Sequence, residues 1–359
     1  MPASLAERLA ARIAATGPIT VADYMASALS DPDFGYYARA DSTPLGAPGD
    51  FTTAPEISQL FGELIGAWLI DCWRQAGSPD PVNLVELGPG RGTLMADIMR
   101  VARAVPEWRA AIRLHLVEIN PALRRSQAAA LAGEAPVWHD TPADIPDGPI
   151  MLVANEFLDA LPIRQLVFWG GKWRERTVGW SAEAGFHFTL SPGVSALSLL
   201  MPPDLRPDQG AVFEISPAVF GAVTEIGRRI ARHGGAALLV DYGRTASGLG
   251  ESLQAVRRHR MVPVLETPGE ADLSAHVDFG AVTRVAREAG ATVAGPVTQG
   301  AFLEALGIGA RADRLKQKAP RDKADALDAG VRRLTGADAM GTLFKAVAIT
   351  AAGIVPAGF

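Results

Sequence analysis

Short runs of apolar residues recur along the chain, and segments with apolar positions at helical spacing lie between them. The clearest runs cover 82–87, 112–117, 150–154 and 236–240. The first run leads through a glycine-rich turn into a helical pattern that contains Leu94, Ile98 and Ala102. Because strands that alternate with helices are joined by right-handed crossovers, the pattern predicts an α/β fold with a mostly parallel sheet and helices on both faces.

The two ends of the chain lie outside this alternation. Near the start, Leu5, Leu9 and Ile13 fall on one stripe and predict an amphipathic helix. This segment slightly resembles a transit peptide, since its arginines outnumber its glutamates, but a plain first helix is the preferred interpretation. Near the other end, 342–350 predicts a last strand at an edge of the sheet.

The stretch between the third and fourth runs has a different character. Residues 165–169 and 172–178 flank Gly170-Gly171 and predict a β-hairpin, and 186–190 predicts a further strand. One core with an N-terminal helical extension and two insertions explains the length of 359 residues better than two tandem domains. The expected parts are the extension (1–81), the first part of the core (82–160), a β-rich and helical insertion (161–233), a core strand (234–243), a second insertion (244–280) and the rest of the core (281–359).

Composition narrows the classes of function. Hydrophobic residues make up 48% and charged residues 20% of the chain, which excludes disorder as the main state. Lys and Arg number 34 against 39 Asp and Glu, so the net charge of −5 disfavours a nucleic-acid partner. No membrane span is expected, because Glu63 and Asp71 interrupt the apolar stretch 60–73. With the single Cys72 and six scattered histidines, neither a disulfide nor a metal site is expected.

The glycine-rich turn 88–92, GPGRG, is the sharpest chemical feature. Such a loop lets backbone N–H groups and a helix N-terminus approach a ligand closely. A dinucleotide-binding loop needs a third glycine at the position of Thr93. Glu86 lies just before the loop, where it would repel a pyrophosphate but suits the cationic amino-acid end of S-adenosylmethionine. The charge therefore favours S-adenosyl-L-methionine as the cofactor.

Acidic residues also end the other predicted strands. Glu118 follows the second strand, where a carboxylate can accept hydrogen bonds from the hydroxyls of a ribose. Because Glu118 lies far along the chain from the glycine loop, the first crossover has to be enlarged, at the corner 106–108. Glu156 and Asp241 are further strand-end acids at which to look for a ligand. The alternative is that GPGRG is only a tight turn and Glu118 only a surface acid.

Further stretches of the chain carry specific motifs. They are DFGYY (33–37), GDFTTAPEIS (49–58) followed by Phe61-Gly62, VELGPGRGTL (85–94), NEFLDALP (155–162), VDYG (240–243) and DLSAHVDF (272–279). Together they resemble the MidA family over most of the chain, although Ser274 stands where that family usually has Thr. The resemblance implies a Rossmann-like class I methyltransferase core that uses S-adenosyl-L-methionine. Mitochondrial members of the family assist the assembly of respiratory complex I (NADH dehydrogenase) by methylating an arginine in one subunit.

The resemblance also implies where the cofactor binds. The loop 50–53 would fold over it, although Thr52, Thr53 and Glu56 are also explained as helix-capping groups. Asn155 would lie where methyltransferases hold the nucleophile, although a satisfied structural amide is the alternative. The expected cofactor-binding residues are Asp50, Phe51, Thr52, Thr53, Glu86, Gly88, Pro89, Gly90, Gly92, Thr93, Glu118, Ile119 and Asn155.

The expected catalytic residues follow from the chemistry of arginine. Its pKa exceeds about 12, so an enzyme that methylates it needs carboxylates that grip the guanidinium by bidentate hydrogen bonds. Glu156 and Asp159 lie on one face if their segment is helical, and Asn155 joins them as a candidate. Asp50 and Asp278 are further candidates for these carboxylates. Alternatively, Asp159 starts a helix and stabilises its dipole.

Three functions stay open on the sequence alone. A protein arginine methyltransferase is preferred, and a small-molecule O- or N-methyltransferase is the alternative, since the fold does not fix the substrate. The third is an assembly factor that docks a partner on Trp169, Trp173 and Trp180. The expected partner is an arginine-containing protein and not a nucleic acid, while a homodimer stays open. The short N-terminus before the first motif favours a bacterial cytoplasmic protein, with the mitochondrial matrix as the location if the source is eukaryotic.

Overall fold

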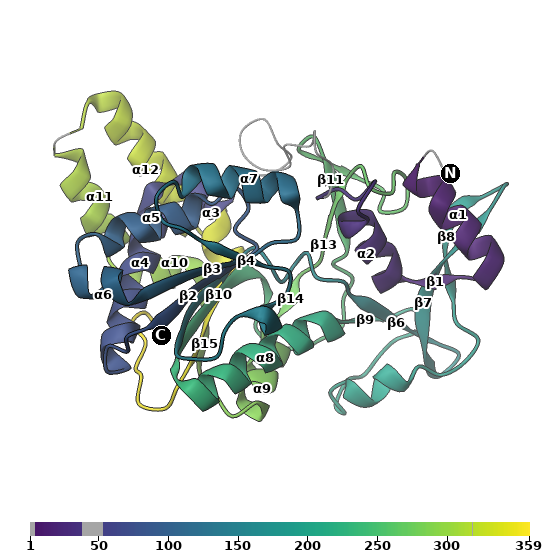
Figure 1. The fold of residues 1–359 in the computed structure, drawn as a ribbon. Coiled ribbons are helices and arrows are strands. Elements are labelled where there is room, and N and C mark those ends of the chain that lie inside the picture. The colour runs from purple at the N-terminus through teal and green to yellow at the C-terminus, as the bar shows by residue number, and fades with distance from the viewer. Residues whose placement is uncertain (1–3, 38–52, 318) are drawn as a thin grey trace. The chain divides into compact units, whose positions relative to one another are not determined.

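The computed structural model describes residues 4–37, 53–317 and 319–359. Contacts along the chain divide it into two compact units, which are described separately (Figure 1). The core unit comprises 52–158, 221–245 and 279–359, and the accessory unit comprises 1–51, 159–220 and 246–278. Residues 52–81, which the sequence grouped with the N-terminal extension, therefore cluster with the core. The N-terminal residues and the two insertions cluster together, which the sequence did not predict.

The core unit is built on a sheet with the strand order β15-β16-β10-β5-β2-β3-β4. These strands are β2 (Val82–Leu87), β3 (Ile112–Val117), β4 (Val137–His139), β5 (Ile150–Asn155), β10 (Gly235–Arg244), β15 (Thr292–Thr298) and β16 (Phe344–Thr350). The strands β4, β3, β2, β5 and β10 pair in parallel, and β16 is antiparallel to both of its neighbours. The predicted α/β fold with a mostly parallel sheet is confirmed.

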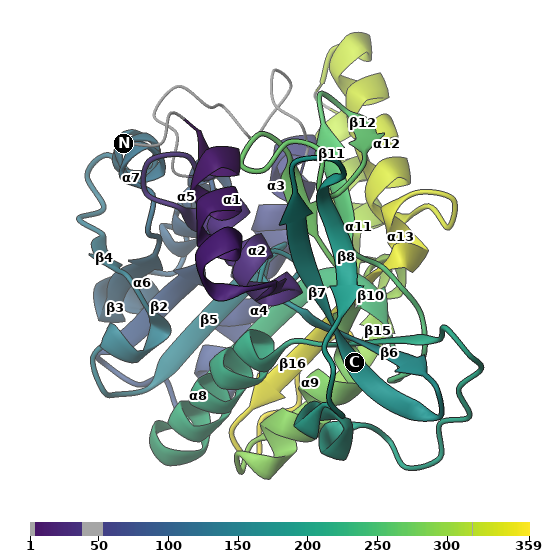
Figure 2. The same cartoon turned by 90° about the vertical axis from the view of Figure 1, so that its right-hand side faces the viewer.

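Helices cover both faces of this sheet. They are α3 (Ala54–Ile57), α4 (Gln59–Gln75), α5 (Thr93–Ala102), α6 (Pro106–Ala111), α7 (Pro121–Ala130), α8 (Pro217–His233), α9 (Phe279–Glu288), α10 (Gln299–Ala305), α11 (Ile308–Lys316), α12 (Arg321–Thr335) and α13 (Met340–Leu343), with a 3₁₀ turn at Pro142–Asp144. Figures 1 and 2 show α4 on one face and α8 with α9 on the other. The expected enlargement of the first crossover is α6, whose Trp108 is fully buried.

The position of the last strand differs from the prediction. An edge strand was expected at 342–350, but β16 lies inside the sheet between β10 and β15, and all of its residues are buried. Its apolar sequence suits a strand that is covered on both faces. The edge is instead β15, which carries Pro296 at an irregularity between Ala294 and Val297. Proline has no N–H to donate to a ladder, so it is tolerated at an edge.

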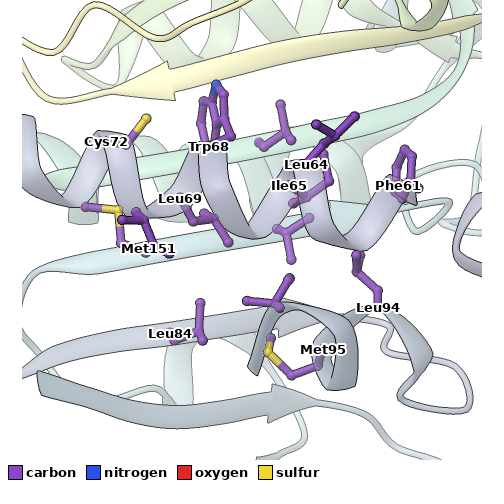
Figure 3. Close-up of a cluster of buried hydrophobic side chains, with 14 of the residues drawn as sticks. Phe61, Leu64, Ile65, Trp68, Leu69, Cys72, Leu84, Leu94, Met95 and Met151 are labelled. Carbon is purple, nitrogen blue, oxygen red and sulfur yellow. The ribbon is translucent and has the colours of Figure 1, made fainter. Parts of the chain in front are cut away.

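Helix α4 packs on the sheet with an apolar face, shown in Figure 3. Trp68 of α4 is buried in the same cluster as Leu84 of β2 and Met151 of β5. On the α5 side, a Cβ at Gly62 would lie 2.5 Å from the Cβ of Asp97, so only glycine allows the two helices to approach this closely. These contacts explain why 52–81 belong to the core unit.

In its described residues, the accessory unit contains small antiparallel sheets and two helices. Its elements are α1 (Leu5–Thr16), β1 (Ile19–Thr20), α2 (Val21–Ser30), β6 (Arg164–Trp169), β7 (Lys172–Ser181), β8 (Gly185–Leu190), β9 (Val212–Ile215), β11 (Gln254–Arg257), β12 (Arg260–Val262), β13 (Asp272–Ser274) and β14 (Val277–Asp278), with a 3₁₀ turn at Ala196–Leu200. One sheet has the order β1-β7-β6-β9, with β8 paired to β7 as Figure 2 shows, and another has the order β12-β11-β13. The predicted hairpin is confirmed as β6 and β7, and Leu5, Leu9 and Ile13 are buried in α1 as expected.

Candidate functional site: the carboxyl edge of the core sheet

The glycine loop joins β2 to α5 with three residues in left-handed conformations. The φ angles of Gly88, Gly90 and Gly92 are +61°, +53° and +86°. A Cβ on Gly88 would lie 2.9 Å from Cδ2 of Phe157, and one on Gly92 would lie 3.3 Å from the Cα of Gln127. The conformation favours glycine at all three positions, and a side chain at Gly88 or Gly92 would also crowd its neighbour. At its three glycines the loop leaves the backbone uncovered by a side chain, just before the first N–H groups of α5, which are available to a ligand.

Glu86, near the end of β2, is a buried carboxyl group. Its side chain is 3% exposed, and the backbone N–H of Met95 in α5 donates a hydrogen bond to it. Within the described part of the chain, no hydrogen-bond partner reaches Oε2. Burial, opposed by the Met95 hydrogen bond, raises the pKa of Glu86 to about 8. A cationic ligand at Oε2 would favour the ionised carboxylate and bring this pKa down.

Glu118 follows β3 and is held by two donors. The N–H of Asn120 donates to Oε1 at 2.8 Å, and Nε2 of Gln127 donates to Oε2 at 3.2 Å. Burial raises the pKa of Glu118, and these hydrogen bonds oppose that increase. The next residue, Ile119, is 53% exposed. A buried carboxylate beside an exposed aliphatic side chain suits a nucleoside, with its ribose on the acid and its base on the apolar surface.

Asn155, the last residue of β5, is hydrogen-bonded to Glu156. Nδ2 of Asn155 donates to Oε1 of Glu156 at 3.1 Å, and the N–H of Ala54 donates to the same oxygen at 3.1 Å. Glu156 has a φ of +52°, which a non-glycine residue adopts only where its surroundings fix it. Asn155 is 8% exposed, and its Oδ1 has no hydrogen-bond partner among the described residues. The amide therefore offers an unused acceptor.

The segment 156–161 forms bends and a turn, not a helix. Glu156 and Asp159 do not share a helical face as predicted, because the left-handed φ of Glu156 takes the backbone off a helical path. For the same reason Asp159 does not start a helix. It belongs to the accessory unit, where burial and the charges of Asp272 and Asp159 raise the pKa of Tyr37, whose hydroxyl donates to Asp272 at 2.9 Å. The catalytic roles of the two acids stay predictions.

Helix α3 is tied to the glycine loop and to the start of α5. The hydroxyl of Thr93 donates to Oε1 of Glu56 at 2.9 Å, and Nη1 of Arg91 lies 3.9 Å from Oε2 of Glu56. Thr53 occupies the N-cap position of α3, but its side chain makes no capping hydrogen bond with the helix. Three further residues expected at the cofactor lie outside the described residues, namely Asp50, Phe51 and Thr52.

Asp241, which was expected to mark a ligand site, has a structural role, and Gln127, which the sequence did not single out, lies at the candidate site. Asp241 is fully buried, and the N–H groups of Leu158 and Tyr242 each donate to it at 2.9 Å. It therefore supports the backbone after β5. Gln127, on α7, donates a hydrogen bond to Glu118. It lies in a segment rich in Ala and Arg. Nothing in the sequence separates it from an ordinary polar residue of a surface helix.

The unused acceptors allow a test of whether the site fits the expected cofactor. Glu86 Oε2 and Asn155 Oδ1 are both buried and lack hydrogen-bond partners in the described chain. They come from neighbouring parallel strands, in which Leu87 pairs with Ala154, so both residues lie near the carboxyl edge of the sheet. An ammonium group brings three N–H donors and a positive charge. The residues present therefore fit the cationic amino-acid end of S-adenosyl-L-methionine.

Two other kinds of feature are absent from the described ranges. They contain no group of three or more His, Cys, Asp or Glu side chains that could hold a metal ion. None of their helices is both long enough and apolar enough to cross a membrane.

Comparisons with known proteins found a matching family model and several similar proteins. A family model described as "Putative S-adenosyl-L-methionine-dependent methyltransferase" matches residues 64–297. The chain is 37% identical to the protein arginine methyltransferase NDUFAF7 homolog, mitochondrial, of Drosophila melanogaster, over 96% of this chain and 84% of the relative. It is 38% identical to protein arginine methyltransferase NDUFAF7, mitochondrial, of Xenopus tropicalis, over 95% of this chain and 84% of the relative.

A solved structure from Burkholderia thailandensis, bound to S-adenosyl-homocysteine, is similar to nearly the whole fold. It is 28% identical, with a TM-score of 0.84, and the match covers 98% of this chain and 92% of that one. The chain belongs to the MidA-like family of S-adenosyl-L-methionine-dependent methyltransferases.

Proposed function

We propose that the protein methylates an arginine side chain of a partner protein, and that this partner is a subunit of respiratory complex I or a similar protein. The observation that carries the proposal is the 37% identity, over 96% of this chain, to a relative named as a protein arginine methyltransferase. The net charge of −5 agrees with a site that attracts both a cationic cofactor and a cationic side chain.

The cofactor-binding roles are assigned as follows. S-adenosyl-L-methionine, when bound, supplies an electrophilic methyl group on a sulfonium. The glycine loop would contact it through backbone atoms, and the Glu118 carboxylate would accept hydrogen bonds from the hydroxyls of its ribose. Glu86 and Asn155 accept hydrogen bonds from its ammonium group. The support for this assignment is that both side chains carry a buried acceptor with no hydrogen-bond partner in the described chain.

The arginine has to be held by carboxylates. A guanidinium keeps its proton below a pH of about 12, so the nitrogen that accepts the methyl group must lose a proton to a nearby base. We assign this to Glu156, because its contacts with Asn155 and Ala54 fix a backbone conformation that would otherwise be unfavourable. Asp159 is the second carboxylate that the sequence proposes for the charge of the guanidinium.

The proposal is tested with purified protein, radiolabelled S-adenosyl-L-methionine and isolated complex I subunits from cells that lack this protein. We expect one subunit to be labelled, and replacing the modified arginine by lysine to abolish the label. Glu156→Gln should lower kcat while the affinity for S-adenosyl-homocysteine stays within about threefold, a loss confined to the reacting step. Label that enters only the small molecules of a metabolite extract would refute the protein substrate and identify a small-molecule methyltransferase.

The location that accompanies this proposal is the bacterial cytoplasm, or the mitochondrial matrix if the source is eukaryotic. The support is that the relatives from Drosophila melanogaster and Homo sapiens are named as mitochondrial. Fractionation of cells expressing a tagged chain tests it. Recovery with the membrane fraction after a high-salt wash would contradict it.

A further inference from the structure

Gln127 makes hydrogen bonds to three parts of the core unit. It lies on α7 with no exposed side-chain surface. Its Nε2 donates to the carbonyl of Gly90 at 2.8 Å and to Oε2 of Glu118 at 3.2 Å. Its Oε1 accepts from Nε1 of Trp138, on β4, at 2.8 Å. One buried amide therefore joins the glycine loop, the acid after β3 and the strand β4.

The orientation of this amide is fixed by its partners. An indole N–H can only donate, so Trp138 must face the oxygen of Gln127. The NH₂ group then faces two acceptors, the Gly90 carbonyl and the Glu118 carboxylate. An amide turned by 180° would place its NH₂ against the indole N–H and its oxygen against both acceptors. Only one orientation satisfies all three groups.

These bonds set the position of Glu118 relative to the loop. Asn120 donates to one oxygen of the carboxylate and Gln127 donates to the other. The same helix contacts the loop directly, since a Cβ on Gly92 would lie 3.3 Å from the Cα of Gln127. A shift of α7 would move the carboxylate and the Gly90 carbonyl together.

We propose that Gln127 is a positioning residue of this methyltransferase, which holds the glycine loop and the Glu118 carboxylate at the separation that the cofactor requires. It acts through Gly90 and Glu118 and does not touch the cofactor. The inference rests on the proposed contact of Glu118 with the ribose. Misplacing either anchor by about 1 Å weakens binding by a large factor, because the cofactor must reach both at once.

The test measures the affinity for S-adenosyl-homocysteine by calorimetry at pH 8 and pH 6. Gln127→Glu keeps the shape of the side chain but places a carboxylate against the Gly90 carbonyl and Glu118. We expect affinity about a hundredfold below that of the unmodified protein at pH 8, the scale of losing a hydrogen bond to a charged group. At pH 6 the introduced acid regains a proton and can donate to Glu118, so the deficit should fall to about tenfold.

Glu86, whose pKa burial raises to about 8, is present in every variant and so cancels from each deficit. A further charged group near this site is Arg124, whose Nε donates to the backbone carbonyl of Glu118 at 2.7 Å. Its guanidinium is charged at both pH values and does not contribute to the difference between them. Gln127→Met, which has no titratable group, should lose about tenfold at both pH values. If Gln127→Glu fails to fold, Trp138→Phe removes only the donor that orients the amide and should weaken binding about threefold to tenfold.

The matched control is Gln299→Glu. Gln299 is also fully buried, but it lies on α10 and donates to the carbonyl of Leu334. This variant should lose stability and keep its affinity for S-adenosyl-homocysteine within about threefold, as expected of a site that only packs.

The variant Glu118→Ala tests the proposed ribose contact independently of the positioning role of Gln127. If Glu118→Ala weakens binding while both Gln127 variants stay within threefold, the positioning role is overturned. A deficit of Gln127→Glu that is equal at the two pH values overturns it as well, since lost packing does not titrate. If Glu118→Ala itself binds normally, the proposed ribose contact has failed and the inference is overturned with it.

Discussion

Glu86→Gln should make the ligand-free protein more stable and the cofactor bind less tightly. Burial raises the pKa of Glu86 from 4.5 to about 8, so folding takes up a proton between these values. The folded state therefore loses stability as pH rises through this window. Relative to low pH, an increase of this size in the pKa lowers the free energy of unfolding by about 5 kcal/mol above pH 8 and by about 3 kcal/mol at pH 7. Glutamine is neutral at every pH and avoids this loss.

The assay is urea unfolding of the ligand-free protein between pH 4.5 and pH 9, together with calorimetric titration of S-adenosyl-homocysteine. The variant should equal the unmodified protein near pH 4.5 and exceed it increasingly up to pH 8. Affinity of the unmodified protein should rise about tenfold per pH unit from pH 6 to pH 8, because an ammonium group selects the ionised carboxylate. The variant should show no such rise. Parallel stability curves for the two proteins would refute the reasoning.

The control for this experiment is the same substitution at Glu118. Both oxygens of Glu118 already accept a hydrogen bond, from Asn120 and Gln127. An amide NH₂ at either oxygen would face a donor, and the cost of such a mismatch is about 1–3 kcal/mol. Glu118→Gln should therefore destabilise the protein where Glu86→Gln stabilises it. Equal effects at the two positions would show that burial alone, and not the hydrogen-bond partners, sets the outcome.

Three further predictions concern the loop, a histidine and the core. Gly88→Ala should abolish detectable binding of S-adenosyl-homocysteine, because its φ is +61° and the new Cβ would lie 2.9 Å from Phe157; normal titration would contradict this. Burial and the neighbouring His139 lower the pKa of His115 to about 4, so the protein should lose stability as pH falls from 6.5 towards 4. His115→Phe should flatten that part of the curve of Tm against pH, and an unchanged curve would count against it. Trp68→Ala should lower the free energy of unfolding by about 3–5 kcal/mol in urea, and a loss below about 1 kcal/mol would show that α4 is not held by this side chain.

The core of the fold followed from local pattern. Residues 82–87 and 112–117 became β2 and β3 without change, because a short apolar run between polar turns has few alternatives. The place of β16 could not be read in the same way. Its sequence predicts a strand, but its neighbours β10 and β15 lie far from it in sequence, and pairing between distant segments leaves no local signal.

The site was predictable where chemistry demands a residue type. The glycine at position 88 is an example, since its φ of +61° is unfavourable for a residue that carries a Cβ. The prediction that Glu156 and Asp159 share a helical face was wrong. The unusual φ of Glu156 is fixed by tertiary contacts, which the local sequence does not reveal. Gln127 was not predicted, since its role depends on partners from three different elements.

The interior place of β16 has a consequence for synthesis of the chain. The ribosome makes β10 and β15 first, and each keeps an unpaired row of N–H and C=O groups until β16 emerges and fills the gap between them. Open strand edges of this kind recruit other chains and promote aggregation. A message truncated before residue 344 would therefore leave β10 with one unpaired edge and β15 without its partner in the described sheet, so a premature stop near the end should produce insoluble protein and not a slightly shortened enzyme.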